Sequence, residues 1–379
     1  MFVGSEQFVL LAIPLFIFSG ELMSRGGVTE RIIDFASAIV GWIRGGLAMI
    51  TIVAEVFFSG ISGSAVADVA ALGSLLIPAM KNRGYNKNFA SALMASAGVL
   101  GPIIPPSIMM VVYGMLANVS VAKLFIGGMI PGIIGAGLMM AYSYYAARKY
   151  NFPREAGLTM AEIKRRILRA ILPLGMPVII MGGILGGVFT PTETAAVACL
   201  YGYIVSKLVY KKLSFRELID SSFNSALDTA KVMFILATSN FITFLMARGQ
   251  IPEQIAEYML SLTNSPYLIL LLINILLLIV GCFLEASCAL IILTPILLSI
   301  TVPLGIDPIL LGVMACVNLS IGTITPPVGL SLYVAMGIGG TSLEKISWAA
   351  LPFVFVLIIM LLIITYIPDL VLFLPRLLM

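Results

Sequence analysis

Long apolar runs limit this chain to structures that cross a membrane. The stretches around 268–283 and 351–367, with their flanks, are each long enough to span a hydrocarbon core of about 30 Å. Inside lipid only helices and closed barrels pair all of their own backbone groups. The sequence lacks the alternating segments of about ten residues that a barrel requires. It therefore predicts an all-α polytopic membrane protein.

The composition excludes several classes of function. Hydrophobic residues make up 60% of the 379 positions and charged residues 11%, against about 25% charged residues in a soluble domain. The chain has no histidine, which excludes histidine-based catalysis and proton relays. Its four cysteines lack CxxC spacing, so neither a disulfide framework nor a metal site of that kind is predicted. With a net charge of only +4, we expect no nucleic-acid partner. Because histidine and a clustered Asp/Glu pair are lacking, we expect no enzyme, and we expect no covalent cofactor.

Basic residues in the polar loops predict the orientation. Lysine and arginine concentrate in the loops 148–169 and 207–216 and in the turn 81–87. Cytoplasmic loops of membrane proteins carry this excess, so all three are placed in the cytoplasm. The segment 171–206 is just long enough to cross the membrane and return, which makes the first two placements consistent.

The two halves of the chain repeat one another. The stretch "ELMSRGGVTERIIDF" (21–35) matches "FLMARGQIPEQIAEY" (244–258) 223 residues later, including the Arg-Gly pair and a glutamate. Further on, "GPIIPPSIMM" (101–110) matches "GTITPPVGLS" (322–331) 221 residues later. Apolar matches arise easily by chance, but charged residues and double prolines in the same order do not, so we infer an internal repeat.

Each half predicts the same series of elements. The series is a membrane helix (7–24; 229–247), an amphipathic arm (28–43; 250–262), an interrupted apolar segment, a helix broken at Pro-Pro (87–117; 307–337) and a closing helix (121–147; 348–373). Residues 173–223 precede the second series and have no counterpart before the first. We therefore expect the sequence to lack an N-terminal region of about two short passes.

The interrupted segments predict re-entrant hairpins. Their interruptions lie at Ser59–Ser64 and at Cys282–Ser287, and each arm is too short to span the membrane comfortably. Counting crossings from the cytoplasmic loops places the base of the first hairpin inside and that of the second outside. The repeats are therefore inverted, which is the architecture of secondary transporters.

The double prolines predict a binding site. Proline removes a backbone N–H and clashes with the preceding turn, so carbonyl groups are freed and can bind a dehydrated cation. The N-terminus of a half-helix offers unpaired N–H groups to an anion. The alternative is a proline kink that only bends the helix. Two repeat-related breaks, each preceded by a polar hairpin tip, favour a central site with one side built by each half.

Polar side chains near the breaks support this interpretation. Asp68 is ionisable within an apolar segment, where a charge is costly unless it is paired or faces water, and Ser64 lies four residues before it on a helix face. In the second half, hydroxyl and amide groups that suit a hard cation are found at Ser287, Asn318, Thr323 and Thr325, with Glu285 at the tip. Interhelical hydrogen bonding is the structural alternative for these residues.

Other polar residues are interpreted as structural. Thr190 to Glu193 form a predicted capping box, with proline at the first helical position. Glu55, Asp228 and Lys231 are assigned to packing or subunit contacts.

The motifs "SGSAVADVAALGSLLIPAM", "GPIIPPS", "GVFTPTETAAV" and "GTITPPVGLSLYV" occur in order along the chain. Together they resemble the large membrane subunit of TRAP (tripartite ATP-independent periplasmic) transporters. The resemblance implies an elevator-type, multi-pass protein of the bacterial inner membrane. It implies Na⁺-coupled uptake of an organic acid anion, such as a C4-dicarboxylate, a sialic acid or another sugar acid. The implied partners are a periplasmic substrate-binding protein, a small four-helix membrane subunit and membrane lipid.

The resemblance also assigns residues to the site. Substrate contacts fall on Ser62, Ser64, Asp68 and Ser107. Two Na⁺ sites fall on Ser59, Gly63, Gly101, Pro105 and Pro106 in the first half, and on Glu285, Ser287, Gly322, Thr323, Thr325, Pro326 and Pro327 in the second.

The expected division of the chain separates a scaffold from a transport domain. Residues 1–45 form a scaffold helix and cytoplasmic arm, 46–118 the first hairpin and broken helix, 119–264 scaffold helices with basic loops and a periplasmic arm, 265–338 the second hairpin and broken helix, and 339–379 a C-terminal membrane helix. A standalone Na⁺/dicarboxylate symporter is the nearest alternative. A membrane-embedded enzyme and a passive channel are less favoured, because clustered catalytic groups are lacking and inverted hairpins indicate alternating access.

Overall fold

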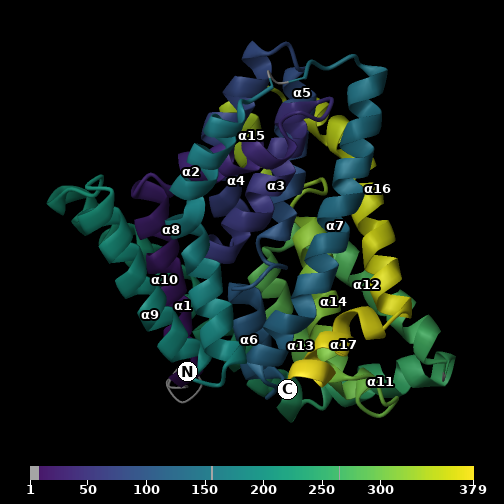
Figure 1. Ribbon diagram of the computed structural model, residues 1–379. Coiled ribbons are helices and arrows are strands. Elements are labelled where there is room, and N and C mark those ends of the chain that lie inside the picture. Colours follow the sequence, from purple (N-terminus) through teal and green to yellow (C-terminus); the bar gives the residue numbers. More distant parts are fainter. Residues whose placement is uncertain (1–7, 155–156, 264) are drawn as a thin grey trace.

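Helices account for the ordered elements of both halves in the computed structural model, which describes residues 8–154, 157–263 and 265–379 (Figure 1). The first half contains α1 (Ala12–Arg25), α2 (Val28–Val40), α3 (Gly46–Ser62), α4 (Ala65–Asn82), α5 (Lys87–Ala97), α6 (Ile108–Leu116) and α7 (Val121–Lys149). The second contains α10 (Phe215–Arg248), α11 (Ile251–Leu262), α12 (Pro266–Phe283), α13 (Ala286–Thr301), α14 (Pro308–Gly322), α15 (Leu330–Gly339), α16 (Leu343–Tyr366) and α17 (Asp369–Leu378). Between the halves lie α8 (Met160–Leu185) and α9 (Pro191–Tyr203).

The lengths of these helices confirm an all-helical membrane protein. Within the described residues, six helical segments are long and apolar enough to cross a membrane: Phe8–Arg25, Val121–Lys149, Met160–Leu185, Phe215–Met246, Pro266–Phe283 and Leu343–Tyr366. By contrast, α3, α13, α14 and α15 are apolar but shorter. Such lengths fit hairpin arms and half-helices that end inside the bilayer.

Both predicted hairpins and both broken helices are confirmed. The prediction that each hairpin arm is too short to span the membrane is wrong for α12, whose 18 residues are long and apolar enough to cross it. The first hairpin, α3–α4, turns at residues 63–64, and the second, α12–α13, turns at residues 284–285. The first broken helix runs from α5 through a short 3₁₀ turn (Gly98–Leu100) to α6, and the second runs from α14 to α15. Both Pro-Pro peptide bonds are cis.

Three helix boundaries differ from the sequence prediction. The helix expected at 229–247 is part of the longer α10, because no glycine or proline interrupts residues 215–248. The closing helix expected at 348–373 divides into α16 and α17 at Pro368, because the residue before a proline is disfavoured in helical conformation. Helix α8 begins inside the expected loop 148–169, at a capping box in which Thr159 and Glu162 hydrogen-bond each other's backbone. The start expected at residue 7 lies outside the described residues.

The two repeats interlock through their broken helices. Helix α6 of the first half packs against α13 and α14 of the second, and α15 of the second packs against α4 and α5 of the first. This exchange is what inverted repeats produce when they share one core. In Figure 1, α5 and α15 lie together at one end of the molecule, and the arm α11 lies at the opposite end.

A second group of helices lies beside this hairpin core. Helix α1 packs along α9 and α10, while the arm α2 packs against α3 and α8. The capping box predicted at Thr190 is confirmed at the start of α9, where the Thr190 hydroxyl accepts from the Glu193 backbone N–H. Figure 1 shows α1, α8, α9 and α10 gathered along one side of the molecule.

Close packing of α7 on the first break gives a stability prediction. A Cβ at Gly128 would lie 2.3 Å from the carbonyl oxygen of Ile103 and 2.7 Å from the Cε of Met110. Gly128→Ala is expected to lower the free energy of unfolding by about 1–3 kcal/mol, the usual cost of overpacking. Gly137→Ala on the same helix is the control, since nothing lies within 4 Å of its Cβ position. Equal melting temperatures of the two variants in detergent would contradict this packing.

Candidate functional site

The tip of the first hairpin lies directly against the first broken helix. Gly63 ends α3 with φ of 68°, a left-handed conformation that glycine adopts readily. A Cβ at this position would lie 2.4 Å from the carbonyl oxygen of Pro106. Ser64 follows in an extended conformation and begins α4. The tip and the Pro-Pro turn are therefore in backbone contact, as the two parts of the first predicted Na⁺ site must be.

The second tip lies against the second broken helix in the same way. The Val328 N–H donates to the carbonyl of Cys282 at 3.2 Å, and a Cβ at Gly322 would lie 2.5 Å from the carbonyl oxygen of Gly281. Glu285 begins α13, where its carboxylate accepts from the Cys288 N–H at 3.0 Å. Backbone and glycine contacts thus join each hairpin to the break of its own repeat.

Hydroxyl groups surround the second break. Ser331 donates its backbone N–H to the Thr323 carbonyl at 2.9 Å and its hydroxyl to Thr323 Oγ1 at 3.2 Å. The hydroxyl of Thr325 donates to the Ile321 carbonyl at 2.8 Å. Both threonine oxygens keep free lone pairs, which a hard cation can use.

A cavity of about 490 Å³ joins the two tips. Six of the predicted site residues line it: Ser62, Gly63 and Ser64 from the first tip, Glu285 and Ser287 from the second, and Thr323 from the second break. The first residues of α4 and α13, Ala65 and Ala286, also line it. Two helix N-termini therefore meet the same space, and each favours negative charge.

Asp68 and Ser107 lie away from this cavity. Both are fully buried and absent from its lining. Ser64 is extended, not helical, so the four-residue spacing does not place Asp68 on the same face. A Cβ at Gly101 would instead lie 2.5 Å from the Asp68 carboxylate, which interacts with the Glu55 carboxylate. Direct substrate contacts by Asp68 and Ser107 therefore remain predictions that this arrangement does not support.

The hydroxyl of Ser107 has local partners. It accepts from the Met110 N–H at 3.2 Å and donates to the Pro102 carbonyl at 2.5 Å, so it caps α6 within the first break.

Asn318 lies in a buried network with Asn274, which in turn donates to Thr365. This network joins α12, α14 and α16, which favours the packing role for Asn318.

A further wall of the cavity comes from α1 and α10. Glu21 of α1 and Asp228 and Lys231 of α10 line the cavity, and Lys231 Nζ lies 2.7 Å from Asp228 Oδ1. Sequence analysis assigned the two α10 residues to packing or subunit contacts. The signal that could have revealed them is the position of an ion pair inside an apolar membrane helix.

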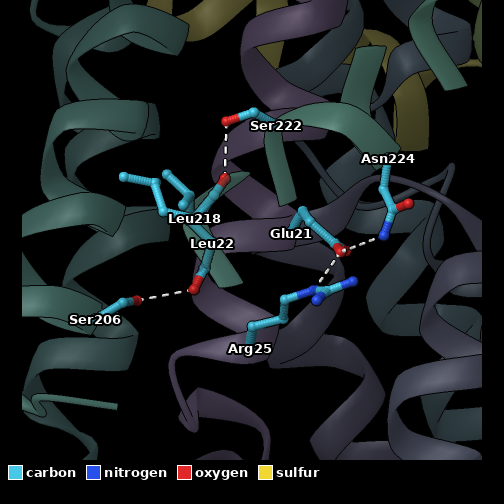
Figure 2. Close-up of polar contacts among 7 residues, drawn as sticks. All are labelled: Glu21, Leu22, Arg25, Ser206, Leu218, Ser222 and Asn224. Atoms are coloured by element: carbon cyan, nitrogen blue, oxygen red, sulfur yellow. Dashed lines mark hydrogen bonds and ion pairs between the residues drawn. The ribbon is translucent and has the colours of Figure 1, made fainter. Parts of the chain in front are cut away.

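Polar contacts hold this wall together. Figure 2 shows Glu21 accepting from Arg25 of the same helix, at 2.6 Å, and from Asn224 of α10, at 3.5 Å. The Ser206 hydroxyl donates to the Leu22 carbonyl at 2.8 Å. Helix α1 is thus hydrogen-bonded to two neighbouring segments. Arg25, the residue that forms an ion pair with Glu21, lies on the same helix.

The charges around the cavity are unequal. Among the lining residues that the structure describes, the acidic groups are Glu21, Asp228 and Glu285, and the basic group is Lys231. An organic anion entering this space would meet more negative than positive charge. Bound cations at the breaks would reverse that balance, since charges close together in a medium of low dielectric interact strongly.

Paired re-entrant hairpins and broken helices around one cavity define the fold of a secondary membrane transporter. The model of the family described as "Tripartite ATP-independent periplasmic transporter, DctM component" matches residues 1–370. The chain belongs to this family, as its motifs predict, and it is a multi-pass protein of the bacterial inner membrane.

Relatives cover nearly the whole chain. It is 43% identical over 99% of its length to the C4-dicarboxylate TRAP transporter large permease protein DctM of Pseudomonas aeruginosa, covering 88% of that protein. It is 39% identical over 100% of its length to the sialic acid TRAP transporter large permease protein SiaM of Vibrio cholerae, also covering 88%. It is 42% identical over 98% of its length to the isethionate TRAP transporter permease protein DctMQ of Oleidesulfovibrio alaskensis, of which it spans only 59%.

A solved structure supports the fold. The YdaH transporter of Alcanivorax borkumensis, whose structure was described as having an unusual topology, superposes with a TM-score of 0.69. The match covers 96% of this chain and 85% of that one. At 16% identity, the similarity concerns the fold alone.

The contact of the first tip with the Pro-Pro turn gives a prediction for Gly63. Gly63→Ala adds both a left-handed alanine and a collision with the Pro106 carbonyl, whereas Gly84→Ala, at φ of 82°, adds only the former, because nothing lies within 4 Å. We expect Gly63→Ala to cost about 1–3 kcal/mol more than Gly84→Ala. Melting temperatures in detergent measure the difference, and equal losses would show that the tip and the turn are not in contact.

Proposed function

We propose that this protein is the large membrane subunit of a Na⁺-coupled transporter that takes up an organic acid anion. One observation carries the proposal: both hairpin tips meet in one cavity, whose described charged lining is three carboxylates and one lysine. Helix N-termini favour an anion there, while the surrounding carboxylates oppose it. Anion binding therefore depends on cations, which is the basis of coupled transport.

Na⁺ ions are proposed to bind where each tip meets its break. Residues Ser59 to Gly63 with Gly101 to Pro106 form one such place, and Glu285 to Ser287 with Gly322 to Pro327 form the other. Carbonyl and hydroxyl oxygens are ligands that suit hard cations. An ion there stabilises the nearby anion, and by reciprocity the anion stabilises the ion.

The substrate and partners are proposed by analogy with the relatives. Their names mention C4-dicarboxylates, sialic acid, isethionate and 2,3-diketo-L-gulonate, all of which carry an acidic group. We propose that a periplasmic binding protein delivers such an anion and that a small membrane subunit completes the complex. A C4-dicarboxylate or a sugar acid fits a cavity of about 490 Å³.

An elevator motion is proposed for the transport step. The interlocked hairpins and broken helices share one packed core, and α1, α8, α9 and α10 lie along its side. The core would move as one body against these helices, carrying anion and ions together. The arms α2 and α11 would brace it from opposite faces of the membrane.

Uptake into proteoliposomes tests the proposed function. The protein would be reconstituted with its small subunit and candidate binding protein, and uptake of labelled succinate, N-acetylneuraminate and 2,3-diketo-L-gulonate measured with and without a Na⁺ gradient. We expect uptake of one of these acids that requires both Na⁺ and the binding protein. Na⁺-driven uptake without the binding protein would identify a standalone symporter, and uptake indifferent to Na⁺ would overturn the coupling.

Thr323→Ala tests the second Na⁺ site. Loss of one hydroxyl ligand is expected to raise the Na⁺ concentration for half-maximal uptake about fivefold, the effect of about 1 kcal/mol. Thr238→Ala is the control, because its hydroxyl donates only to its own helix. Unchanged Na⁺ dependence in Thr323→Ala would remove this residue from the site.

A further inference from the structure

Lys231 occupies an unusual position for a charged residue. It lies at the middle of the segment Phe215–Met246, which is long and apolar enough to cross the membrane. A charge at mid-membrane is costly unless it faces a wet space or a partner. The structure provides both, because Lys231 lines the cavity and pairs with Asp228, which also lines it.

The ion pair itself does not explain the lysine. The side chains of Lys231 and Asp228 are 71% and 57% exposed, and an exposed pair on one helix stabilises a protein little. Both side chains are largely exposed, so the pair does not stabilise a packed interior. Two apolar residues at these positions would let the helix lie in the membrane without the free-energy cost of two charges. The presence of the lysine therefore indicates that it binds a molecule inside the cavity.

The other charged groups of the lining cannot attract an anion. Glu21 and Glu285 are acidic, and each is already hydrogen-bonded, Glu21 to Arg25 and Asn224, Glu285 to the N–H of Cys288. Lys231 is the basic group among the described lining residues. An ammonium on a flexible four-carbon stem can change partners without moving its helix.

We propose that Lys231 binds a carboxylate or other acidic group of the transported anion, from the α10 wall of the cavity, and that Asp228 holds the lysine when the anion is absent. This inference deepens the proposed function and rests on it. The anion would then be held between helix N-termini and Na⁺ on the hairpin side and one ammonium on the α10 side.

The position of Lys231 restricts this contact to one orientation of the proposed transporter. Helix α10 lies outside the body of hairpins and broken helices that is proposed to move. The lysine therefore contacts the anion in the orientation seen here, and the contact breaks when the body of hairpins and broken helices moves away. Lys231 should set the affinity for the anion on one side of the membrane and leave the Na⁺ sites, which move with the hairpins, unchanged.

Variants of the pair test the proposal in the reconstituted complex. Lys231→Gln is expected to raise the KM for the anion about tenfold, the scale of one lost charge-assisted contact, while half-maximal Na⁺ changes less than about twofold. Lys231→Arg keeps the charge and should stay within about threefold of the wild type. Asp228→Asn frees the lysine and should leave KM equal or lower. Lys164→Gln, on an exposed turn of α8, is the surface control.

A binding measurement separates this contact from loss of structure. The shift in melting temperature that saturating anion produces, in detergent with Na⁺ present, should shrink in Lys231→Gln, whereas the shift that Na⁺ alone produces should persist. Equal anion KM values and equal anion shifts in wild type and Lys231→Gln would overturn the proposal while Na⁺-driven uptake still stands. Loss of both shifts would also overturn it, because the lysine would then be structural. Wild-type protein without Na⁺-driven uptake of any of the three acids would overturn the proposed function and this inference together.

Discussion

The fold depends on satisfying backbone polar groups at two broken helices inside a membrane. Hydrocarbon offers no water to unpaired N–H and C=O groups, and each Pro-Pro sequence removes partners from the helical ladder. In the structure, a hairpin tip packs against each break. Gly63 lies against the Pro106 carbonyl, and the Val328 N–H donates to Cys282. Each break therefore requires a hairpin, and the two pairs together require a shared core.

Much of this arrangement could be predicted from the sequence, because backbone constraints are local. Pro-Pro, glycine at the tip and short apolar arms specify the hairpins and breaks before any tertiary contact is known. Side-chain placement could not be predicted as well. The expected face shared by Ser64 and Asp68 assumed a helix that begins one residue earlier than it does. Asp228 and Lys231 were assigned to packing or subunit contacts, because only the tertiary structure shows that α10 lines the same cavity as the tips.

The repeat duplicates the backbone of the two halves more closely than their side-chain chemistry. The first hairpin buries the carboxylates of Glu55 and Asp68, which interact with each other. The positions 223 residues later hold Leu278 and Ile291. Near the second hairpin, Asn274 and Asn318 form a neutral hydrogen-bonded network instead. The two proposed Na⁺ sites thus have different electrostatic surroundings, since buried carboxylates lie beside the first of them.

Unequal charge around the cavity bears on the coupling of anion and cation binding in the proposed function. If the anion could bind without cations, the body that is proposed to move would carry the anion in either direction, and the proposed Na⁺ gradient would not drive uptake. Three lining carboxylates against one lysine oppose that event, because like charges at short range in a medium of low dielectric repel. In the proposed function, cations bound on the hairpin side would reverse this balance. Within the proposed function, the same acidic lining that makes the cavity unfavourable for a lone anion makes it favourable for the anion and Na⁺ together.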